Sequence, residues 1–292
     1  MNCYLCNSTT FSDRKGQVRD APHLKIVECT DCGLVTLSSL GHIKAGFYEE
    51  SSMRDADPLA VEMYGSDPTP VEVWLKDNDW DDQRRFDSLK LLITNKRIMD
   101  FGCGAGGFLR KAQQFASVAD GVELERRMRE YWQGRITIFP SVEAVEGNYD
   151  LITAFHVFEH LPDPIAMLKT LAQQLSKHGR IVIEVPSSED ALLTLFDSGP
   201  FQRFSYWSPH LFLYNAETLR RLAKQAGLRV VSIQQYQRYP LSNHLHWLGN
   251  GKPGGHLKWA FLDSPELKAA YGNALAAVAK CDTLIAHIER VD

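Results

Sequence analysis

Between residues 97 and 237 the chain alternates short apolar runs with amphipathic stretches, and this alternation restricts the possible folds more than any other feature. The apolar runs are candidate strands at 97–101, 118–123, 135–139, 149–157, 179–186 and 229–237. The stretches between them have helical spacing at 106–116, 124–134, 164–179 and 215–228. Apolar strands joined by helices form a parallel sheet that is covered on both faces. We therefore predict an α/β fold with a Rossmann-like, doubly wound sheet.

Several segments lie outside this alternation. The inserts at 186–214 and 238–265 are rich in aromatic residues, His, Pro and Gly, and we expect them to shape a substrate pocket. Residues 265–291 are expected to form a closing amphipathic helix. We interpret residues 51–95 as a linker that ends in a leading helix at 83–95, and residues 96–292 as the main domain.

The charge and hydropathy of the chain limit its partners. The net charge of the 292 residues is -4, which offers no overall basic field for nucleic acid or an anionic membrane. No apolar run reaches the length of about 20 residues that spans a bilayer. The first residues also lack the basic and apolar pattern of a secretory signal. We expect a cytoplasmic protein without a membrane span or a nucleic-acid partner, and the oligomeric state stays open.

The N-terminus carries a cysteine pattern that is typical of a metal site. Cys3 and Cys6 form one CxxC knuckle, and Cys29 and Cys32 form a second one. Two such knuckles supply four thiolates for a tetrahedral zinc ion, and four thiolates leave no open position for catalysis. Thiols stay reduced in the expected compartment, so disulfides are disfavoured. The sequence predicts a small zinc-ribbon-like unit over residues 1–50 that binds structural zinc.

A glycine cluster follows the first predicted strand and precedes a helix. Gly102, Gly104 and Gly107 satisfy the pattern GxGxxG, which also occurs in nicotinamide-dependent oxidoreductases. Asp100 stands two residues before the first of these glycines. Glu123 ends the next strand, where a carboxylate can accept both hydroxyls of a ribose. The pattern indicates a nucleoside-containing ligand.

Together with the segment YDLITAFHVFEHLPDP at 149–164, these motifs resemble the class I S-adenosylmethionine-dependent methyltransferases over about residues 90–235. The resemblance implies that the glycine loop wraps the methionine and ribose of the donor, that Glu123 holds the ribose, and that residues 139–142 frame the adenine. The donor contacts implied in this way are Asp100, Gly102, Cys103, Gly104, Gly106, Phe108, Glu123, Val142 and Phe155.

Three histidines are candidates for the general base that methyl transfer to a hydroxyl or an acidic carbon requires. His156 and His160 flank the end of the fourth strand, and His210 lies in the insert after the fifth strand. With the cysteine unit, these segments resemble the zinc-containing sugar methyltransferases that act on nucleotide-linked deoxysugars. In this resemblance, His160 and His210 match the two histidines of that family.

The resemblance implies S-adenosylmethionine, structural zinc and a small carbohydrate acceptor. The acceptor contacts expected are Tyr48, Tyr206 and Arg238. Pro209 replaces the family's glutamate and His156 its asparagine, which leaves methylation of carbon and of oxygen both open. Other readings of the sequence are RNA or protein methylation with the zinc unit as reader, a nicotinamide-dependent oxidoreductase, and a non-catalytic interaction protein.

Overall fold

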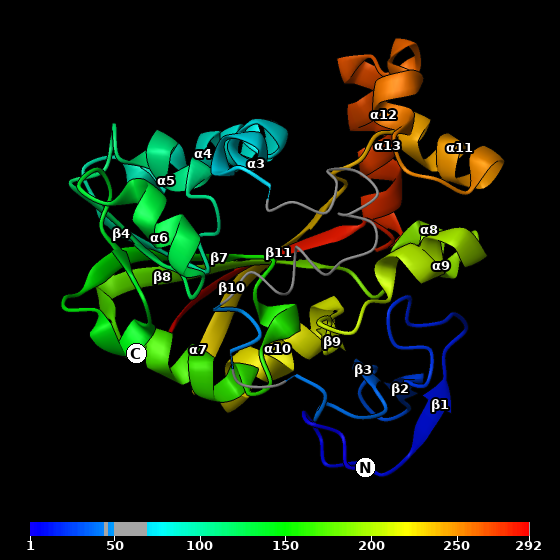
Figure 1. The fold of residues 1–292 in the computed structure, drawn as a ribbon. Coiled ribbons are helices and arrows are strands. Elements are labelled where there is room, and N and C mark those ends of the chain that lie inside the picture. Colours follow the sequence, from blue (N-terminus) through cyan, green and yellow to red (C-terminus); the bar gives the residue numbers. More distant parts are fainter. Residues whose placement is uncertain (44–45, 50–68, 292) are drawn as a thin grey trace.

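The computed structural model describes residues 1–43, 46–49 and 69–291. At its centre lies a seven-stranded sheet in the order β10-β11-β8-β7-β4-β5-β6 (Figure 1). Its strands are β4 (Arg97–Phe101), β5 (Val118–Val122), β6 (Ile138–Phe139), β7 (Tyr149–Phe155), β8 (Leu175–Pro186), β10 (Leu228–Tyr236) and β11 (Thr283–Arg290). The strands from β6 to β8 pair in parallel. The predicted α/β sheet is confirmed, and every predicted strand overlaps an observed one.

The last strand of the sheet occupies part of the helix that was predicted over 265–291. Helix α13 (Pro265–Ala277) ends early, and β11 then runs antiparallel between β8 and β10. Leu284, Ala286 and Ile288 are fully buried at every second position, which is the spacing of one strand face. The prediction of a single closing helix is wrong because the apolar residues near the C-terminus follow a period of two.

Helices cover both faces of the sheet, as Figure 1 shows. One face carries α3 (Val71–Asp77), α4 (Asp79–Ile93), α5 (Gly107–Ala112) and α6 (Arg126–Trp132), and the other carries α7 (Pro164–Gln173) and α10 (Ala216–Gln225). Phe86 and Phe108 belong to one buried cluster with the sheet, whereas Leu168 and Leu219 belong to a second. The two apolar clusters, one on each face, are the reason that the strands are apolar throughout.

Helix boundaries follow the caps more closely than the apolar pattern. Asn215 caps α10 through a capping box, as its position before the helix predicts. Helix α7, in contrast, ends at Gln173 and not near Gly179, because Leu175 already pairs with Tyr149 at the start of β8. The leading helix predicted at 83–95 is α4, which begins earlier.

The N-terminal unit is an antiparallel sheet that continues into the main domain. Its strands β1 (Phe11–Asp13), β2 (Ile26–Cys29) and β3 (Val35–Leu37) are joined by β9 (Phe212–Leu213) from the insert at 186–214. The Arg14 side chain also donates a hydrogen bond of 2.9 Å to the backbone oxygen of Ser188. The unit is therefore tied to the main domain, while residues 51–68 of the predicted linker lie outside the described residues.

Both inserts contain helices. The first includes α8 (Ala191–Thr194) and α9 (Gly199–Ser205), and the second includes α11 (Leu241–Asn250), α12 (Gly255–Lys258) and a 3-10 turn (Ala260–Leu262). Helices α11, α12 and α13 project together from one end of the sheet (Figure 1). Within the part of the chain that the structure describes, no helix has the length and apolarity needed to cross a membrane.

Candidate active site

A cavity of about 690 Å³ opens where strands β4, β5 and β7 end. Its wall includes the loop 101–107, Glu123, Phe155, His160 and Arg238. The carboxyl edge of a parallel sheet is the usual place for a ligand, because the loops there converge from several strands. The volume lies in the range of pockets that enclose a small organic ligand.

The glycine loop needs glycine for two reasons. Gly102, Gly104 and Gly106 have φ angles of 70°, 52° and 75°, in the left-handed region that other residues rarely adopt. A Cβ on Gly102 would also lie 2.5 Å from a methyl carbon of Val157. The loop therefore exposes backbone groups to the cavity and then starts α5 at Gly107.

Glu123 organises this loop from the end of β5. Its carboxylate accepts hydrogen bonds from the backbone nitrogen of Gly104 at 2.7 Å and from that of Glu125 at 2.9 Å. The carboxylate lines the cavity and stays partly accessible. Its position allows it to accept hydrogen bonds from a bound ligand.

Asp100 lies deeper, at the end of β4, and is almost fully buried. The Thr153 hydroxyl donates a hydrogen bond of 2.7 Å to it. Burial raises the pKa of Asp100 to about 7, because little water reaches the carboxylate and the bond from Thr153 offsets only part of the cost.

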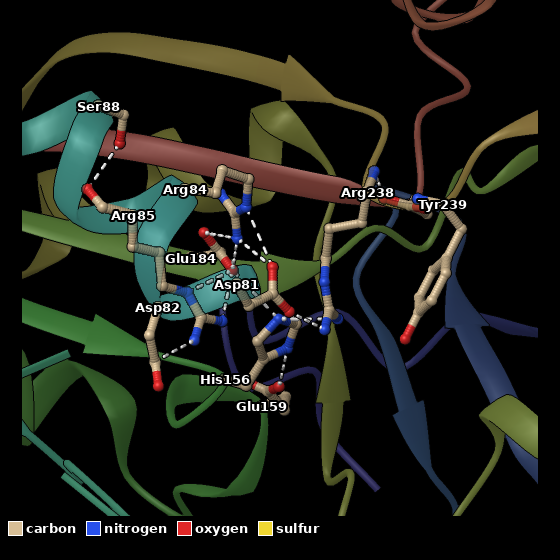
Figure 2. Close-up of polar contacts among 11 residues, drawn as sticks. Asp81, Asp82, Arg84, Arg85, Ser88, His156, Glu159, Glu184, Arg238 and Tyr239 are labelled. Carbon is tan, nitrogen blue, oxygen red and sulfur yellow. Dashed lines mark hydrogen bonds and ion pairs between the residues drawn. The ribbon is translucent and has the colours of Figure 1, made fainter. Parts of the chain in front are cut away.

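A buried network of charges lies beside the cavity (Figure 2), and its members Asp81, Arg85 and Arg238 line the cavity wall. Glu184, at the end of β8, accepts hydrogen bonds from Arg84 at 2.8 Å and from Arg85 at 2.7 Å. Asp81 pairs with Arg84 and with Arg238. Burial alone would raise the pKa of Glu184, but its ion pairs with Arg85 and Arg84 hold that pKa well below its usual range.

The sequence did not predict that α4 contributes to this wall. Asp81, Asp82 and Arg85 line the cavity. The signal was present as two adjacent acids followed by two adjacent arginines, which sequence reasoning treats as a solvated helix face.

His156 lies in the cavity wall with both ring nitrogens engaged. Its Nδ1 lies 3.2 Å from Glu159 and its Nε2 lies 3.3 Å from Glu184. Its backbone has a φ of 56°, in the left-handed region. Because carboxylates occupy both nitrogens, His156 is not placed to accept a proton from a ligand.

His160 is the predicted histidine with a nitrogen free to face the cavity. Its Nδ1 lies 3.0 Å from the carbonyl oxygen of Pro209, which accepts its hydrogen bond and leaves Nε2 with a lone pair. The Tyr48 ring packs edge-on against it, with 6.2 Å between ring centroids. Burial lowers the pKa of His160 to about 4, so its ring is neutral near pH 7.

His210 is placed differently from the prediction. It lies against His160, with ring centroids 4.9 Å apart, but it lines a small hollow beside Trp207 and not the cavity. Burial lowers the pKa of His210 to about 3. His160 lies on the cavity side of this pair, and the assignment of His210 as the general base stays a prediction.

The other predicted contact residues also form two groups, those that line the cavity and those that do not. The cavity is lined by all the predicted donor residues except Val142: Asp100, Gly102, Cys103, Gly104, Gly106, Phe108, Glu123 and Phe155. Val142 is buried in the apolar core instead. Of the predicted acceptor contacts, Tyr48 and Arg238 line the cavity. Tyr206 lies outside the cavity. It packs into the N-terminal unit against Gly16, because its segment turns toward that unit.

The four N-terminal cysteines converge on one point. Their Sγ atoms all lie within 4.8 Å of one another, with 3.5 Å between Cys3 and Cys32 and 3.4 Å between Cys6 and Cys29. A zinc ion with bonds of about 2.3 Å places tetrahedral sulfur atoms roughly 3.8 Å apart. The quartet fits zinc.

Comparison with known proteins agrees with this geometry. Residues 77–233, more than half of the chain, match the family described as "Methyltransferase domain". The ubiquinone biosynthesis O-methyltransferase of Aeromonas salmonicida (strain A449) is 26% identical over 168 residues, which cover 52% of this chain and 70% of that protein. The protein of the same name from Aromatoleum aromaticum (strain DSM 19018 / LMG 30748 / EbN1) is 23% identical over 184 residues, covering 54% and 74%.

A solved structure shows the shared fold. The SAM-dependent methyltransferase from Archaeoglobus fulgidus superposes with a TM-score of 0.51 at 17% identity, covering 80% of this chain and 98% of that one. The family match favours methyl transfer over the nicotinamide-dependent alternative, although the glycine pattern alone did not separate them. The chain belongs to the methyltransferase-domain family and is an S-adenosylmethionine-dependent methyltransferase.

Proposed function

We propose that this enzyme transfers the methyl group of S-adenosylmethionine to a hydroxyl oxygen of a small molecule. One observation carries the proposal: the glycine loop with Glu123 and the neutral imidazole of His160 line the same cavity. A donor cradle and a group that can assist loss of a proton are what O-methylation requires.

The donor is proposed to lie along the glycine loop. Backbone groups of Gly102 to Gly106 would contact its methionine and ribose, and the Glu123 carboxylate would accept from the ribose hydroxyls. Arg85, which packs over the Phe155 ring at 4.6 Å, supplies positive charge for the methionine carboxylate. These residues bind and orient the donor.

The acceptor is proposed to lie beside Tyr48 and His160. In the transfer, the hydroxyl oxygen forms a bond to the methyl carbon while the bond from that carbon to sulfur breaks, and the sulfur keeps the electron pair. The hydroxyl must also lose its proton, and His160 assists this loss through its free nitrogen. Tyr48 and Arg238 would orient the rest of the acceptor.

Oxygen is favoured as the methylated atom because relatives of this chain are named O-methyltransferases of ubiquinone biosynthesis. These names do not support the sugar acceptor that the resemblance implied. A sugar acceptor is a second candidate. The cysteine quartet and the paired histidines occur together in this chain, and the cavity wall carries polar groups. RNA or protein methylation has weaker support, because the small-molecule relatives do not favour it.

We also propose that the four cysteines hold structural zinc. The ion would fix the unit whose strand β3 pairs with β9, directly after His210. Its role is to stabilise this side of the acceptor region, since four thiolates leave no position for a substrate.

Isothermal titration with S-adenosylmethionine tests the donor site. The wild type should bind, and Glu123→Ala should weaken binding by about 10–100-fold, because charged hydrogen bonds contribute about 1.5–3 kcal/mol. Glu130→Ala, an exposed acid of the neighbouring helix, is the matched control and should bind like the wild type. No binding by the folded wild type would reject the proposal.

A product assay tests the acceptor side. Incubation with labelled donor and a panel of catechols, phenols and nucleotide sugars should label one class, and mass spectrometry should place the methyl group on oxygen. His160→Ala should lower turnover by on the order of 10²-fold or more with donor affinity unchanged. Methyl transfer to carbon, or full turnover by His160→Ala, would contradict the account.

A further inference from the structure

Glu159, His160 and His210 form a second cluster of metal-ligand side chains. One ligand atom from each residue lies within 4.8 Å of the other two. Two hydrogen bonds hold together the segments that supply them: the backbone nitrogen of Leu211 donates to the carbonyl of Glu159 at 2.8 Å, and Nδ1 of the His160 side chain donates to the carbonyl of Pro209 at 3.0 Å. The folded chain therefore holds the three side chains together.

The cluster contains polar atoms that lack partners. Glu159 is completely buried, and among the described residues its Oε2 has no hydrogen-bond partner. The Nδ1 atom of His210 is also buried, and no described residue bonds to it. Buried polar atoms in native proteins are nearly always paired, and buried carboxylates are paired with cations or bind metals.

The surrounding charges do not satisfy Glu159 well. Its other oxygen contacts His156 at 3.2 Å, but His156 also contacts Glu184 at 3.3 Å. Arg84 and Arg85 pair with Glu184 and not with Glu159. One oxygen of the Glu159 carboxylate thus shares His156 with Glu184, and the other has no hydrogen-bond partner among the described residues.

We propose that Glu159, His160 and His210 bind a divalent transition-metal ion, with Zn²⁺ as the best match, beside the acceptor part of the cavity. Two imidazoles and one carboxylate are a donor set of zinc sites that keep an open position. Bonds of about 2.0–2.1 Å place tetrahedral ligand atoms roughly 3.4 Å apart, and the three candidate ligand atoms already lie within 4.8 Å of one another. Because His160 lines the cavity, the open position faces the acceptor.

The role of this ion rests on the proposed function, whereas its binding does not. A hydroxyl oxygen bound at the open position would lose its proton to solvent more readily, because the ion stabilises the resulting oxyanion. That oxygen would then form the bond to the methyl carbon while the bond from carbon to sulfur breaks. In this form the free nitrogen of His160 binds the ion instead of taking the proton, and Glu159 and His210 supply the other two protein ligands.

Metal binding is tested on the full chain without donor or acceptor. After treatment with EDTA and titration with zinc chloride, elemental analysis should find two tightly bound ions per wild-type chain, one of them at the cysteine quartet. His210→Ala and Glu159→Gln should each keep one ion. The affinity of the second site should fall by more than the 10–100-fold that loss of a supporting residue causes.

His178→Ala, which removes an exposed histidine of β8, is the matched control and should keep both ions. Circular dichroism shows whether each variant is folded, and an anomalous difference peak between the three side chains in a zinc-soaked crystal provides a readout independent of mutation. A single ion per wild-type chain, or two ions in Glu159→Gln, would overturn the proposal. Donor titration is measured separately, so its failure would reject the proposed function without deciding this one.

Discussion

Asp100 illustrates how the cavity changes the chemistry of a single carboxyl group. The residue is 3% exposed, and burial raises its pKa to about 7. Asp82 and Glu123 push the pKa in the same direction, whereas Thr153 and Arg85 oppose it. Near neutral pH a small change in surroundings therefore decides the charge of this group, which lines the cavity beside the glycine loop.

Stability should depend on pH through Asp100. Its folded pKa of about 7 lies above the unfolded value of about 3.9, so its contribution is present below the unfolded pKa and is lost as pH rises through 7. The loss is on the order of 4 kcal/mol. Urea unfolding without donor measures this effect at pH 5 and pH 8. Relative to the wild type, the free energy of unfolding of Asp100→Asn should be higher at pH 8 than at pH 5. An equal difference at both values would contradict the shifted pKa.

At position 102 of the loop, both the backbone conformation and a neighbouring side chain require glycine. Gly102→Ala forces a side chain into the left-handed region and places its Cβ near Val157. The cost should be roughly 2–4 kcal/mol from backbone strain and overpacking, with a loss of donor binding. Gly134→Ala is a control with the same backbone requirement and open space around it. Similar unfolding free energies for the two variants would show that the contact with Val157 is unimportant.

At the scale of elements, helix α4 joins the sheet to the cavity. Its apolar side packs Phe86 and Leu89 on the sheet, while Arg84 and Arg85 meet Glu184 from the end of β8. These two arginines thus pair with a buried acid of the sheet and do not face solvent alone. An amphipathic pattern alone cannot distinguish this arrangement from a solvated face, because both place charges opposite the apolar side.

Removing the central acid of this network should be costly. Glu184→Ala leaves Arg84 and Arg85 buried without their carboxylate, and loss of one partner of a buried ion pair costs about 3–5 kcal/mol. Urea unfolding measures the effect. Glu217→Ala, which breaks an exposed pair with Arg221, should cost no more than about 1 kcal/mol. A similarly small loss for Glu184→Ala would mean that the network does not stabilise the fold.

For the whole molecule, the sequence predicts the donor side of the cavity better than the acceptor side. The glycine loop and Glu123 follow consecutive strands, so their local pattern determines where they meet. His210 and Tyr206 come from a long insert whose path depends on the N-terminal unit, and their neighbourhood in sequence did not predict that both lie outside the cavity wall. The sequence did not predict the antiparallel strand β11, because the apolar residues that follow helix α13 were interpreted as a continuation of that helix.

The N-terminal unit should depend on its metal. Cys29→Ser should lose the ion of the cysteine quartet and lower the Tm, because metal binding contributes folding free energy to so small a unit. Turnover should fall with donor affinity preserved, since β3 holds the segment after His210. Cys281→Ser, a buried thiol outside the quartet, should keep the metal content unchanged. Unaltered metal content in Cys29→Ser would exclude the quartet as the site.

A crystal structure with bound S-adenosylhomocysteine would show where the donor lies. We predict that the ribose hydroxyls lie against Glu123, that the methionine end lies along the glycine loop, and that the sulfur points toward His160. The product bound elsewhere, or its sulfur turned away from His160, would contradict this prediction.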